Sequence, residues 1–494
     1  MKYHIITFGC QMNEADSDLM DTVLGRSGWQ ACESADEADL IVLNTCSVRE
    51  RPEQKAFSLL GELRPWKAAD PKRVLAVAGC MAQRAARDIL RRAPHVDIVL
   101  GTRAFHRIEE LVSRARSGER PLIALEMEAD APPHDSSCRL LAPSPSGSVA
   151  LAKEAQPLAP AVPGRSPDPR PEARDPTLRA FVPIIRGCSN FCSYCIVPHV
   201  RGPEASRPPD EIRREVESLV AAGTREVTLL GQNVLAYGRD LTPSPSFERA
   251  QGGEGPTPSP NLERGQGGED FPHLLRDLNT IPGLWRIRFT TCHPRDVTPE
   301  LISAIADLEK VCEHIHLPIQ AGANRLLEEM NRGYTTERYL GIVDALRSHV
   351  PGIAITTDML VGFPGETEAE FEQSLALYQQ IRFDAAFMFA FSPRPGTKAA
   401  TMDNQVPRKV RIERLTRVIE MQNRITVEIN TGAIGEEAEV LVDGPAPHGE
   451  GLLAGRARNH KQVVFPGDPS LRGSLVTVRL TQAHLWGFTG QLTH

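Results

Sequence analysis

The stretch Arg186-Gly187-Cys188-Ser189-Asn190-Phe191-Cys192-Ser193-Tyr194-Cys195 places three cysteines in CxxxCxxC spacing directly after an expected strand. We call Cys188, Cys192 and Cys195 the loop triad. Closely spaced cysteines on one loop can wrap one corner of an iron–sulfur cubane, which normally takes four thiolates. Only three are local here, which leaves one iron open for an outside ligand, and an open position usually distinguishes a catalytic metal site from a structural one. We predict a cluster site; structural zinc and coincidental core thiols are the alternatives.

The region around this loop, 179–405, alternates strand-like and helical stretches. Expected strands lie at 181–185, 226–230, 285–290, 314–317, 353–360 and 385–389, and helices at 210–222, 298–307, 336–349 and 367–381. Six βα units predict a partial (β/α)6 barrel. Inside it, 242–255 (TPSPSFERAQGGEG) is nearly duplicated by 257–270 (TPSPNLERGQGGED). The turn-forming composition predicts a flexible insert, 242–270, in one βα loop.

The flanking regions complete an α/β chain. Residues 1–128 carry strand-like runs at 3–7, 39–43, 74–77 and 96–100 between helical stretches, which predicts a small parallel α/β domain. Residues 129–178 contain eleven prolines and predict a disordered linker. A basic connecting helix is expected at 406–431. Alternating strands at 438–442, 461–465, 474–479 and 485–492 predict a small antiparallel β-barrel over 432–494.

Composition narrows the class of protein. The 494 residues are 41% apolar and 24% charged, which is ordinary for a globular protein. No run of about 18 apolar residues predicts a membrane span, and the start, Met1-Lys2-Tyr3-His4-Ile5, lacks the apolar region of a secretory signal. We therefore expect a cytoplasmic protein that contacts no membrane. The net charge of −7 means that a nucleic-acid partner must be met by local basic patches.

A second cysteine set depends on the fold. Cys10, Cys46 and Cys80, here called the sheet triad, each end or closely follow one of the first three strands. The carboxyl ends of parallel strands share one edge, where ligands bind, so the three thiols should converge. A lone cysteine is usually a small buried hydrophobe, but three in phase predict a shared cluster. The other four cysteines are expected to be core or linker thiols, with Cys292 a weak pocket candidate: Cys32, Cys138, Cys292 and Cys312.

These motifs together resemble the radical S-adenosylmethionine (radical SAM) superfamily. The sheet triad and a C-terminal barrel similar to a TRAM module narrow the resemblance to methylthiotransferases. Residues 7–13 (TFGCQMN), 43–50 (LNTCSVRE), 79–84 (GCMAQR) and 195–202 (CIVPHVRG) resemble the MiaB branch. The RimO branch, which modifies a ribosomal protein, typically carries a GCPKN-like first motif instead. The resemblance covers about 1–128, 179–241 and 271–494.

The resemblance implies an enzyme, a transferase that replaces the hydrogen on carbon 2 of N6-dimethylallyladenosine beside the tRNA anticodon with a methylthio group. It implies two [4Fe-4S] clusters and S-adenosylmethionine. The loop-triad cluster would cleave S-adenosylmethionine reductively, and the sheet-triad cluster would hold the sulfur. An unactivated aromatic C–H bond needs a cofactor of this kind, because no side chain supplies a radical. The implied partners are the tRNA anticodon stem-loop and an electron donor such as flavodoxin or ferredoxin, and we expect a monomer.

Further residues fall where a barrel active site should lie. The expected S-adenosylmethionine contacts are Tyr194, Gly231, Gln232, Asn233, Gly362, Phe363, Pro364 and Gly365, with Gln320 and Arg394 as weaker candidates. Glycines at strand ends let the backbone approach a ligand closely. Plain turns and, for Tyr194, a packing role are the alternatives.

RNA contact is expected from basic residues. Arg456, Arg458 and Lys461, beside His460, are expected in one β segment, where the two arginines project from one strand face. A second patch is the helical set Arg408, Lys409, Arg411, Arg414 and Arg417. A solvated basic face is the alternative to phosphate contact for both.

Three other functions compete with this interpretation. A methylthiotransferase could act on threonylcarbamoyl-adenosine in tRNA or on a ribosomal-protein aspartate, and the motif at 10–13 counts against both. An RNA-binding iron–sulfur protein without turnover is disfavoured by the two complete triads. The chain departs from the family pattern in its long linker, in the insert 242–270, and at Cys292 and Phe391, where serine and tyrosine are usual.

Overall fold

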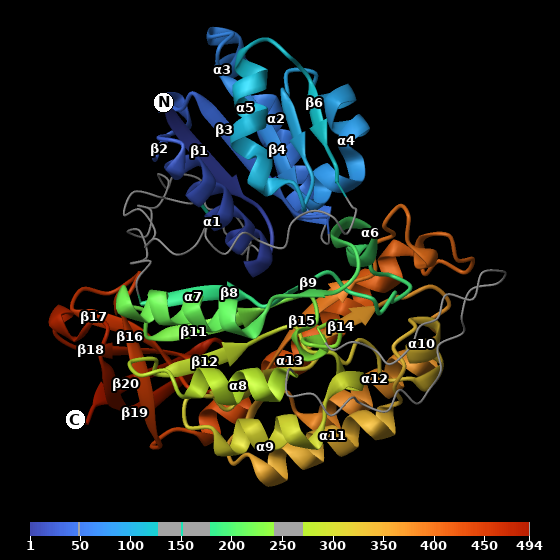
Figure 1. Ribbon diagram of the computed structural model, residues 1–494. Coiled ribbons are helices and arrows are strands. Elements are labelled where there is room, and N and C mark those ends of the chain that lie inside the picture. The colour runs from blue at the N-terminus through green and yellow to red at the C-terminus, as the bar shows by residue number, and fades with distance from the viewer. Residues whose placement is uncertain (48–49, 127–149, 152–177, 242–269, 494) are drawn as a thin grey trace.

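The computed structural model describes residues 1–47, 50–126, 150–151, 178–241 and 270–493. Figure 1 shows an N-terminal α/β layer above a central partial barrel, with a small C-terminal β-barrel beside it. This is the predicted fold class. Of the expected linker, 129–178, only 150–151 and Leu178 are described, and the insert 242–270 lies outside the described residues except for Asp270. Within the described ranges, no helix has the length and hydropathy needed to cross a membrane.

The N-terminal domain is a parallel sheet of order β2-β1-β3-β4-β5-β6, with β7 beside β1. Its strands are β1 (Lys2–Thr7), β2 (Gln30–Ala31), β3 (Leu40–Thr45), β4 (Val74–Gly79), β5 (Ile98–Leu100), β6 (Leu122–Ala124) and β7 (Ala150–Leu151). Its helices are α1 (Gln11–Arg26), α2 (Glu50–Glu62), α3 (Arg64–Ala69), α4 (Cys80–Arg92) and α5 (Ile108–Arg116). Helices α1 and α5 cover one face, and α2, α3 and α4 the other. Because both faces are covered, β3 and β4 are buried along their whole length, which explains their continuous apolar sequence.

The central domain is a partial barrel of six parallel strands. They are β8 (Arg179–Pro183), β11 (Glu226–Leu230), β12 (Arg286–Phe289), β13 (His314–His316), β14 (Ala354–Val361) and β15 (Ala385–Ala390). A bridge between Ile287 and Val311 joins the first three strands to the last three. The outer helices are α7 (Pro209–Ala221), α8 (Phe271–Asn279), α9 (Pro299–Asp307), α10 (Asn324–Glu329), α11 (Thr336–His349) and α12 (Glu368–Ile381). Thr298, Thr335 and Thr367 cap three of these helices by accepting a backbone N–H.

Helix α13 (Arg408–Gly432) leads into the C-terminal barrel. The barrel closes in the order β16-β17-β18-β20-β19. Its strands are β16 (Glu437–Pro445), β17 (Leu452–Ala457), β18 (Gln462–Pro466), β19 (Leu475–His484) and β20 (Gly487–Leu492). All pairs are antiparallel except β18 with β20, which are parallel. Strand β17 is absent from the sequence prediction.

Two arginines of β12 seat the C-terminal barrel on the central domain. Arg286 donates to the carbonyl oxygens of Arg456 and Glu439 over 2.7 and 3.0 Å. Arg288 donates to the carbonyl oxygens of Arg458 and Ala457 over 2.7 and 2.9 Å. Arg286 is the first residue of β12 and Arg288 the third, so the contact with the small barrel begins at the amino-terminal end of this strand.

Candidate active site

The loop triad lies between two short elements, β9 (Ile185–Arg186) and α6 (Val197–Arg201). Strand β9 pairs with β10 (Ala205–Ser206), so the loop is closed at its base. Gly187 opens the loop at a φ of +78°, and a Cβ there would strike the carbonyl oxygens of the returning chain at Gly202. Only glycine fits this approach, so packing dictates the residue that precedes the first cysteine.

Backbone hydrogen bonds order the cysteines. The Cys188 amide donates to the Gly202 carbonyl over 3.1 Å, and the Cys195 amide donates to the Cys192 carbonyl over 2.9 Å. Burial raises the pKa of Cys188 to about 11 and of Cys195 to about 12. Iron binds thiolates, so cluster binding would release these protons. Three thiols on one ordered turn fit a corner of a cubane.

Arg332 is a buried cation beside the loop triad. Its Nη1 lies 3.3 Å from the Cys192 Sγ and 3.4 Å from the Tyr194 hydroxyl. Nη2 donates to the Pro318 carbonyl over 3.2 Å, and Nε to the Tyr334 hydroxyl, also over 3.2 Å. These partners are neutral, apart from the sulfur, which is anionic when it binds metal. A cluster held by three thiolates would therefore supply the negative charge that this arginine faces.

Four non-glycine residues with positive φ mark the same edge of the partial barrel. Phe191 and Asn331 have φ of +46° and +57°, and Thr291 and Gln320, each just past a barrel strand, have +64° and +70°. The Asn331 side chain donates to the carbonyls of Phe191 and Asn190 over 3.1 Å each. Such strain persists only where the surroundings enforce it, and it clusters at functional sites.

The sheet triad comes from three neighbouring strands. Cys10 caps α1 just after β1, Cys46 directly follows β3, and Cys80 opens α4 directly after β4. The strands are parallel and paired in the order β1-β3-β4, so all three cysteines lie at one sheet edge. This is the placement expected from the sequence.

Close packing brings these strand ends together. Gly9 has a φ of +148°, and a Cβ there would lie 2.9 Å from the Cys46 Cβ. Burial raises the pKa of Cys80, Arg201 opposes the rise, and the nearby Cys10 adds to it, so the Cys10 and Cys80 thiols lie close enough to interact. In the part of the chain that the structure describes, no three Cys, His, Asp or Glu side chains surround a single-ion position. A four-iron cluster, by contrast, spreads its thiolate ligands over several irons.

The three residues after β11 differ in their contacts. Gln232 accepts a hydrogen bond from the Gly187 amide over 2.6 Å, so it supports the cysteine loop. A Cβ at Gly231 would strike a side chain of β9. The Asn233 Nδ2 donates to Asp296 Oδ2 over 2.7 Å, whereas its buried Oδ1 has no protein partner among the described residues.

Two further buried polar atoms near the loop lack a partner among the described residues: His293 Nε2 and Ser193 Oγ. The His293 Nδ1 accepts from the Arg295 amide over 3.2 Å, which leaves the proton on Nε2. Burial lowers the pKa of His293, so the ring is neutral. An unpaired buried polar group costs about 1–3 kcal/mol. Together with Asn233 Oδ1, these atoms could each form a hydrogen bond with a polar ligand.

In the glycine-rich turn after β14, some residues pack in the interior and others line an open hollow. Phe363 is fully buried in the barrel core. Gly362 leaves room for the Arg411 side chain, which a Cβ would strike. Pro364 and Gly365 line a hollow of about 700 Å³, which also reaches the turn of the loop triad. Only these last two residues of the turn therefore face space that a ligand can enter.

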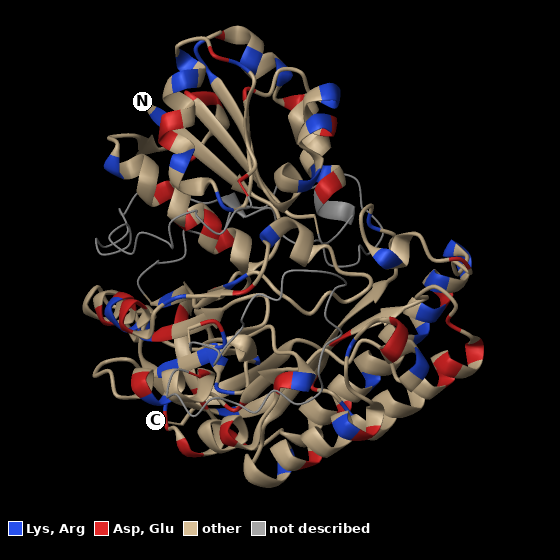
Figure 2. Cartoon of the chain, turned by 45° about the vertical axis from the view of Figure 1, so that its right-hand side comes forward, with Lys and Arg blue, Asp and Glu red and all other residues tan. Residues whose placement is uncertain are grey.

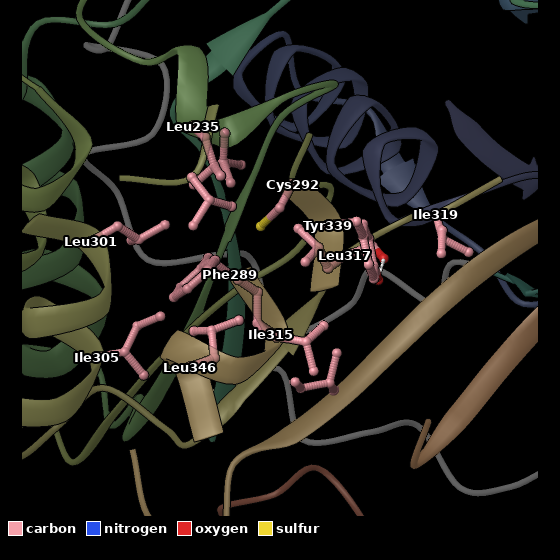
Figure 3. Close-up of a cluster of buried hydrophobic side chains, with 14 of the residues drawn as sticks. Leu235, Phe289, Cys292, Leu301, Ile305, Ile315, Leu317, Ile319, Tyr339 and Leu346 are labelled. Carbon is pink, nitrogen blue, oxygen red and sulfur yellow. Dashed lines mark hydrogen bonds between the residues drawn. The ribbon is translucent and has the colours of Figure 1, made fainter. Parts of the chain in front are cut away.

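Two other candidates lie in the barrel core. Cys292 belongs to the apolar cluster of Figure 3, near Leu235 and Phe289, and burial raises the pKa of its thiol. The Tyr194 ring packs against the same cluster, and burial raises the pKa of its hydroxyl. Both placements agree with the packing alternatives that the sequence left open.

Two of the predicted RNA-contact residues, Arg458 and Lys461, face the central domain. Strand β17 ends before Arg458, so the expectation that Arg456 and Arg458 project from one strand face is wrong. Arg458 forms an ion pair with Glu313 over 2.6 Å, and Lys461 with Asp384 over 2.9 Å. These contacts hold the two domains together and do not form an open basic face.

The basic helix α13 is also largely engaged. Arg414 pairs with Glu366 over 2.7 Å, and Arg417 with a neighbouring glutamate over 2.7 Å. Arg408 and Lys409, in the first turn, are exposed. Figure 2 shows basic and acidic residues interspersed over the described chain, without one dominant basic stripe. Of the five basic residues predicted as a patch on this helix, Arg408 and Lys409 are therefore the exposed pair.

Sequence analysis missed Arg332, His293 and Ser193. His293 stands just past a barrel strand, which was the available signal. Arg332 is 140 positions from the cysteine that it contacts, so no local pattern marks it.

Three family models match the chain. Residues 2–101 match the uncharacterized protein family UPF0004, residues 182–378 the radical SAM superfamily, and residues 433–493 the TRAM domain. The first two contain the sheet triad and the loop triad.

Full-length relatives are also similar. The tRNA-2-methylthio-N(6)-dimethylallyladenosine synthase of Moorella thermoacetica is 44% identical over 99% of this chain and 98% of its own length. The synthase of the same name from Carboxydothermus hydrogenoformans is 41% identical, over 99% of each chain. Among solved structures, the radical S-adenosylmethionine methyltransferase TsrM from Kitasatospora setae has a TM-score of 0.51 at 14% identity. That match covers 92% of this chain and 78% of TsrM, and it supports the fold alone.

Proposed function

The chain belongs to the family of the tRNA-2-methylthio-N(6)-dimethylallyladenosine synthases, and from this we propose the reaction that its site performs. It is a radical SAM methylthiotransferase that adds a methylthio group to carbon 2 of N6-(dimethylallyl)adenosine next to the anticodon of tRNA. The observation that carries this proposal is the 44% identity to a named synthase over nearly the whole chain. The two cysteine triads supply the ligands that such chemistry needs.

The loop triad holds the cluster that cleaves S-adenosylmethionine, and the sheet triad holds a second [4Fe-4S] cluster. When bound, these groups supply the one-electron chemistry and the sulfur that no side chain provides. Arg332 balances the charge of the first cluster through its contact with the Cys192 Sγ. The Gln232 side chain fixes the start of the loop by accepting a hydrogen bond from the Gly187 amide.

S-adenosylmethionine lies at the edge of the barrel marked by the unpaired polar atoms. The Asn233 Oδ1 accepts a hydrogen bond from it. The His293 Nε2 and the Ser193 hydroxyl also form hydrogen bonds with it. Pro364 and Gly365 line the hollow that Ser193 also lines. The neutral His293 donates without carrying a charge, so it does not repel the sulfonium of the cofactor.

The tRNA anticodon stem-loop is the substrate, and an already unstacked loop base enters the barrel. Arg408 and Lys409 contact its phosphates, since both are exposed at the start of α13. A flavodoxin or ferredoxin supplies electrons, and the protein acts as a cytoplasmic monomer. The functional units are 1–128, 179–405, the connecting helix 406–431 and the barrel 432–494.

Nucleoside mass spectrometry tests this function. The chain is expressed in a strain that lacks its own methylthiotransferase, and tRNA is digested to nucleosides. We expect the 2-methylthio-N6-dimethylallyl nucleoside to appear and the unmethylthiolated precursor to fall. If the precursor persists although iron analysis shows both clusters loaded, the assigned substrate is wrong. A strain without the dimethylallyl group on its tRNA is the control.

A further inference from the structure

One arginine touches the elements of both triads. Arg201 ends α6, six positions after Cys195, and its side chain is 5% exposed. Its Nε lies 3.3 Å from the Cys80 Sγ, and its Nη2 donates to Asp16 Oδ2 over 2.7 Å. Asp16 belongs to α1, the helix that Cys10 caps. A single side chain on the helix after the loop triad thus reaches two elements that carry sheet-triad cysteines.

Hydrogen bonds join α6 to the N-terminal domain around Arg201, at an interface that we call the seam. The Thr102 hydroxyl donates to the Val200 carbonyl over 2.5 Å, and Arg103 donates to the Arg201 carbonyl over 3.2 Å. Cys80 packs with Ile196 and Val200 in one buried cluster. The backbone of α6 is therefore fixed to the N-terminal domain independently of the Arg201 side chain.

Buried charged groups meet at the seam. Asp16 is fully buried and faces two cations, because Arg186 Nη2 also lies 3.4 Å from its Oδ1. The Arg201 guanidinium therefore brings its positive charge to 3.3 Å from the Cys80 sulfur. Hydrogen bonds to a ligand sulfur and nearby positive charge both favour the reduced form of an iron–sulfur cluster, since reduction adds an electron.

We propose that Arg201 is a positioning residue for the sheet-triad cluster, which orients the Cys80 sulfur through its Nε–H and raises the reduction potential of that cluster. The inference rests on the proposed function, which assigns a cluster to this triad. Arg201 ends the helix that directly follows the loop triad, so it contacts the sheet triad from a segment next to the loop that holds the other cluster.

The test isolates one cluster. In a full-length background with Cys188, Cys192 and Cys195 each changed to Ala, only the sheet triad can bind a cluster. Arg201→Met, Arg201→Lys and the control Arg103→Met are introduced there. Iron and sulfide content, the electron paramagnetic resonance spectrum after one-electron reduction by dithionite, and the midpoint potential are measured.

We expect Arg201→Met to lower the midpoint potential and alter the spectrum, or to lose iron selectively. Arg201→Lys, which keeps the charge, should recover part of the shift. Arg103→Met removes bonds to the same seam without touching a ligand sulfur, so it should leave the potential unchanged. An unchanged potential and spectrum in Arg201→Met, or an equal shift in Arg103→Met, would overturn the proposal. A background protein that binds no iron would instead refute the assigned second cluster, before any Arg201 variant is compared.

Discussion

The two cysteine triads present similar chemistry on opposite kinds of scaffold. The loop triad occupies eight consecutive positions, and its shape comes from a glycine turn and a closed loop base. The sheet triad spans 71 positions, from Cys10 to Cys80, and its shape comes from the order of three parallel strands. A buried arginine nitrogen lies 3.3 Å from one sulfur of each triad.

The difference concerns what each site depends on. A local loop needs its own turn residues and their supports, so damage to it should remain local. A site built from strand ends needs the packing of the N-terminal sheet, so a small change between two strands should disturb all of its ligands together. The two sites should therefore be separable by mutation.

The largest effect is expected from Cys188→Ala. Removal of a loop-triad ligand should abolish conversion of S-adenosylmethionine to 5′-deoxyadenosine by reduced protein, because the cluster that binds the cofactor is lost. Chromatography of the reaction products measures this. Cys312→Ala removes a buried thiol outside both triads and should keep the activity. Normal cleavage by Cys188→Ala would show that the loop is not the cleavage site.

Cys10→Ala should separate the two sites. We expect it to retain some 5′-deoxyadenosine formation while methylthiolated nucleoside falls to background, because only the sulfur-holding cluster is damaged. Both products are quantified in one reaction. Full methylthiolation by this variant would contradict the role assigned to the sheet triad. Cys32→Ala, a buried thiol in the same domain, is the matched control.

Gly79→Ala tests whether strand packing alone holds the sheet triad. Gly79 has a φ of +93°, and an added Cβ would strike the Thr45 carbonyl on the neighbouring strand. We expect iron to fall from about eight to about four atoms per chain, with S-adenosylmethionine cleavage retained. Gly61→Ala, in an open position on α2, should keep all the iron and raise stability by about 0.5–1 kcal/mol. Equal iron contents in the two variants would remove the contrast between the scaffolds.

The smallest effect is expected from deletion of residues 242–270. These residues are rich in turn-forming types and include no triad cysteine. Both clusters and the methylthiolation rate should therefore be preserved. Binding of tRNA is measured by a filter or fluorescence assay beside the full-length chain. A severalfold loss of tRNA affinity would assign the insert a role in docking.

Much of the fold follows from sequence periodicity. Strand 226–230 and helix 336–349 match β11 and α11 residue for residue. Strand β17 was missed because Gly451 and Gly455 interrupt a run without β-branched residues. Helix α13 is anchored in its second half because Gln422 and Thr426 donate to backbone carbonyls of the barrel at 383 and 384. Tertiary contacts of this kind outweigh local propensity.

The residues of the candidate site also differ in whether the sequence alone predicts them. Both triads were accessible to sequence reasoning, one through local spacing and the other through the phase of the strands. Arg201 and Arg332 were not, because each acts on a sulfur more than 120 positions away. The arginines of the C-terminal barrel, Arg456 and Arg458, were misinterpreted for a related reason. A basic residue at a domain interface and one on an open surface have the same sequence pattern.

The seat of the C-terminal barrel has a consequence for protein engineering. Arg286 and Arg288 bind it mainly through carbonyl oxygens, which every amino acid carries. This domain contact therefore depends more on the backbone path of the barrel than on the identity of its side chains. A foreign barrel that follows the same path, with basic residues kept at the positions of Arg458 and Lys461 for the flanking ion pairs, should be graftable onto the central domain. The C-terminal barrel can thus be exchanged while both cysteine triads stay unchanged.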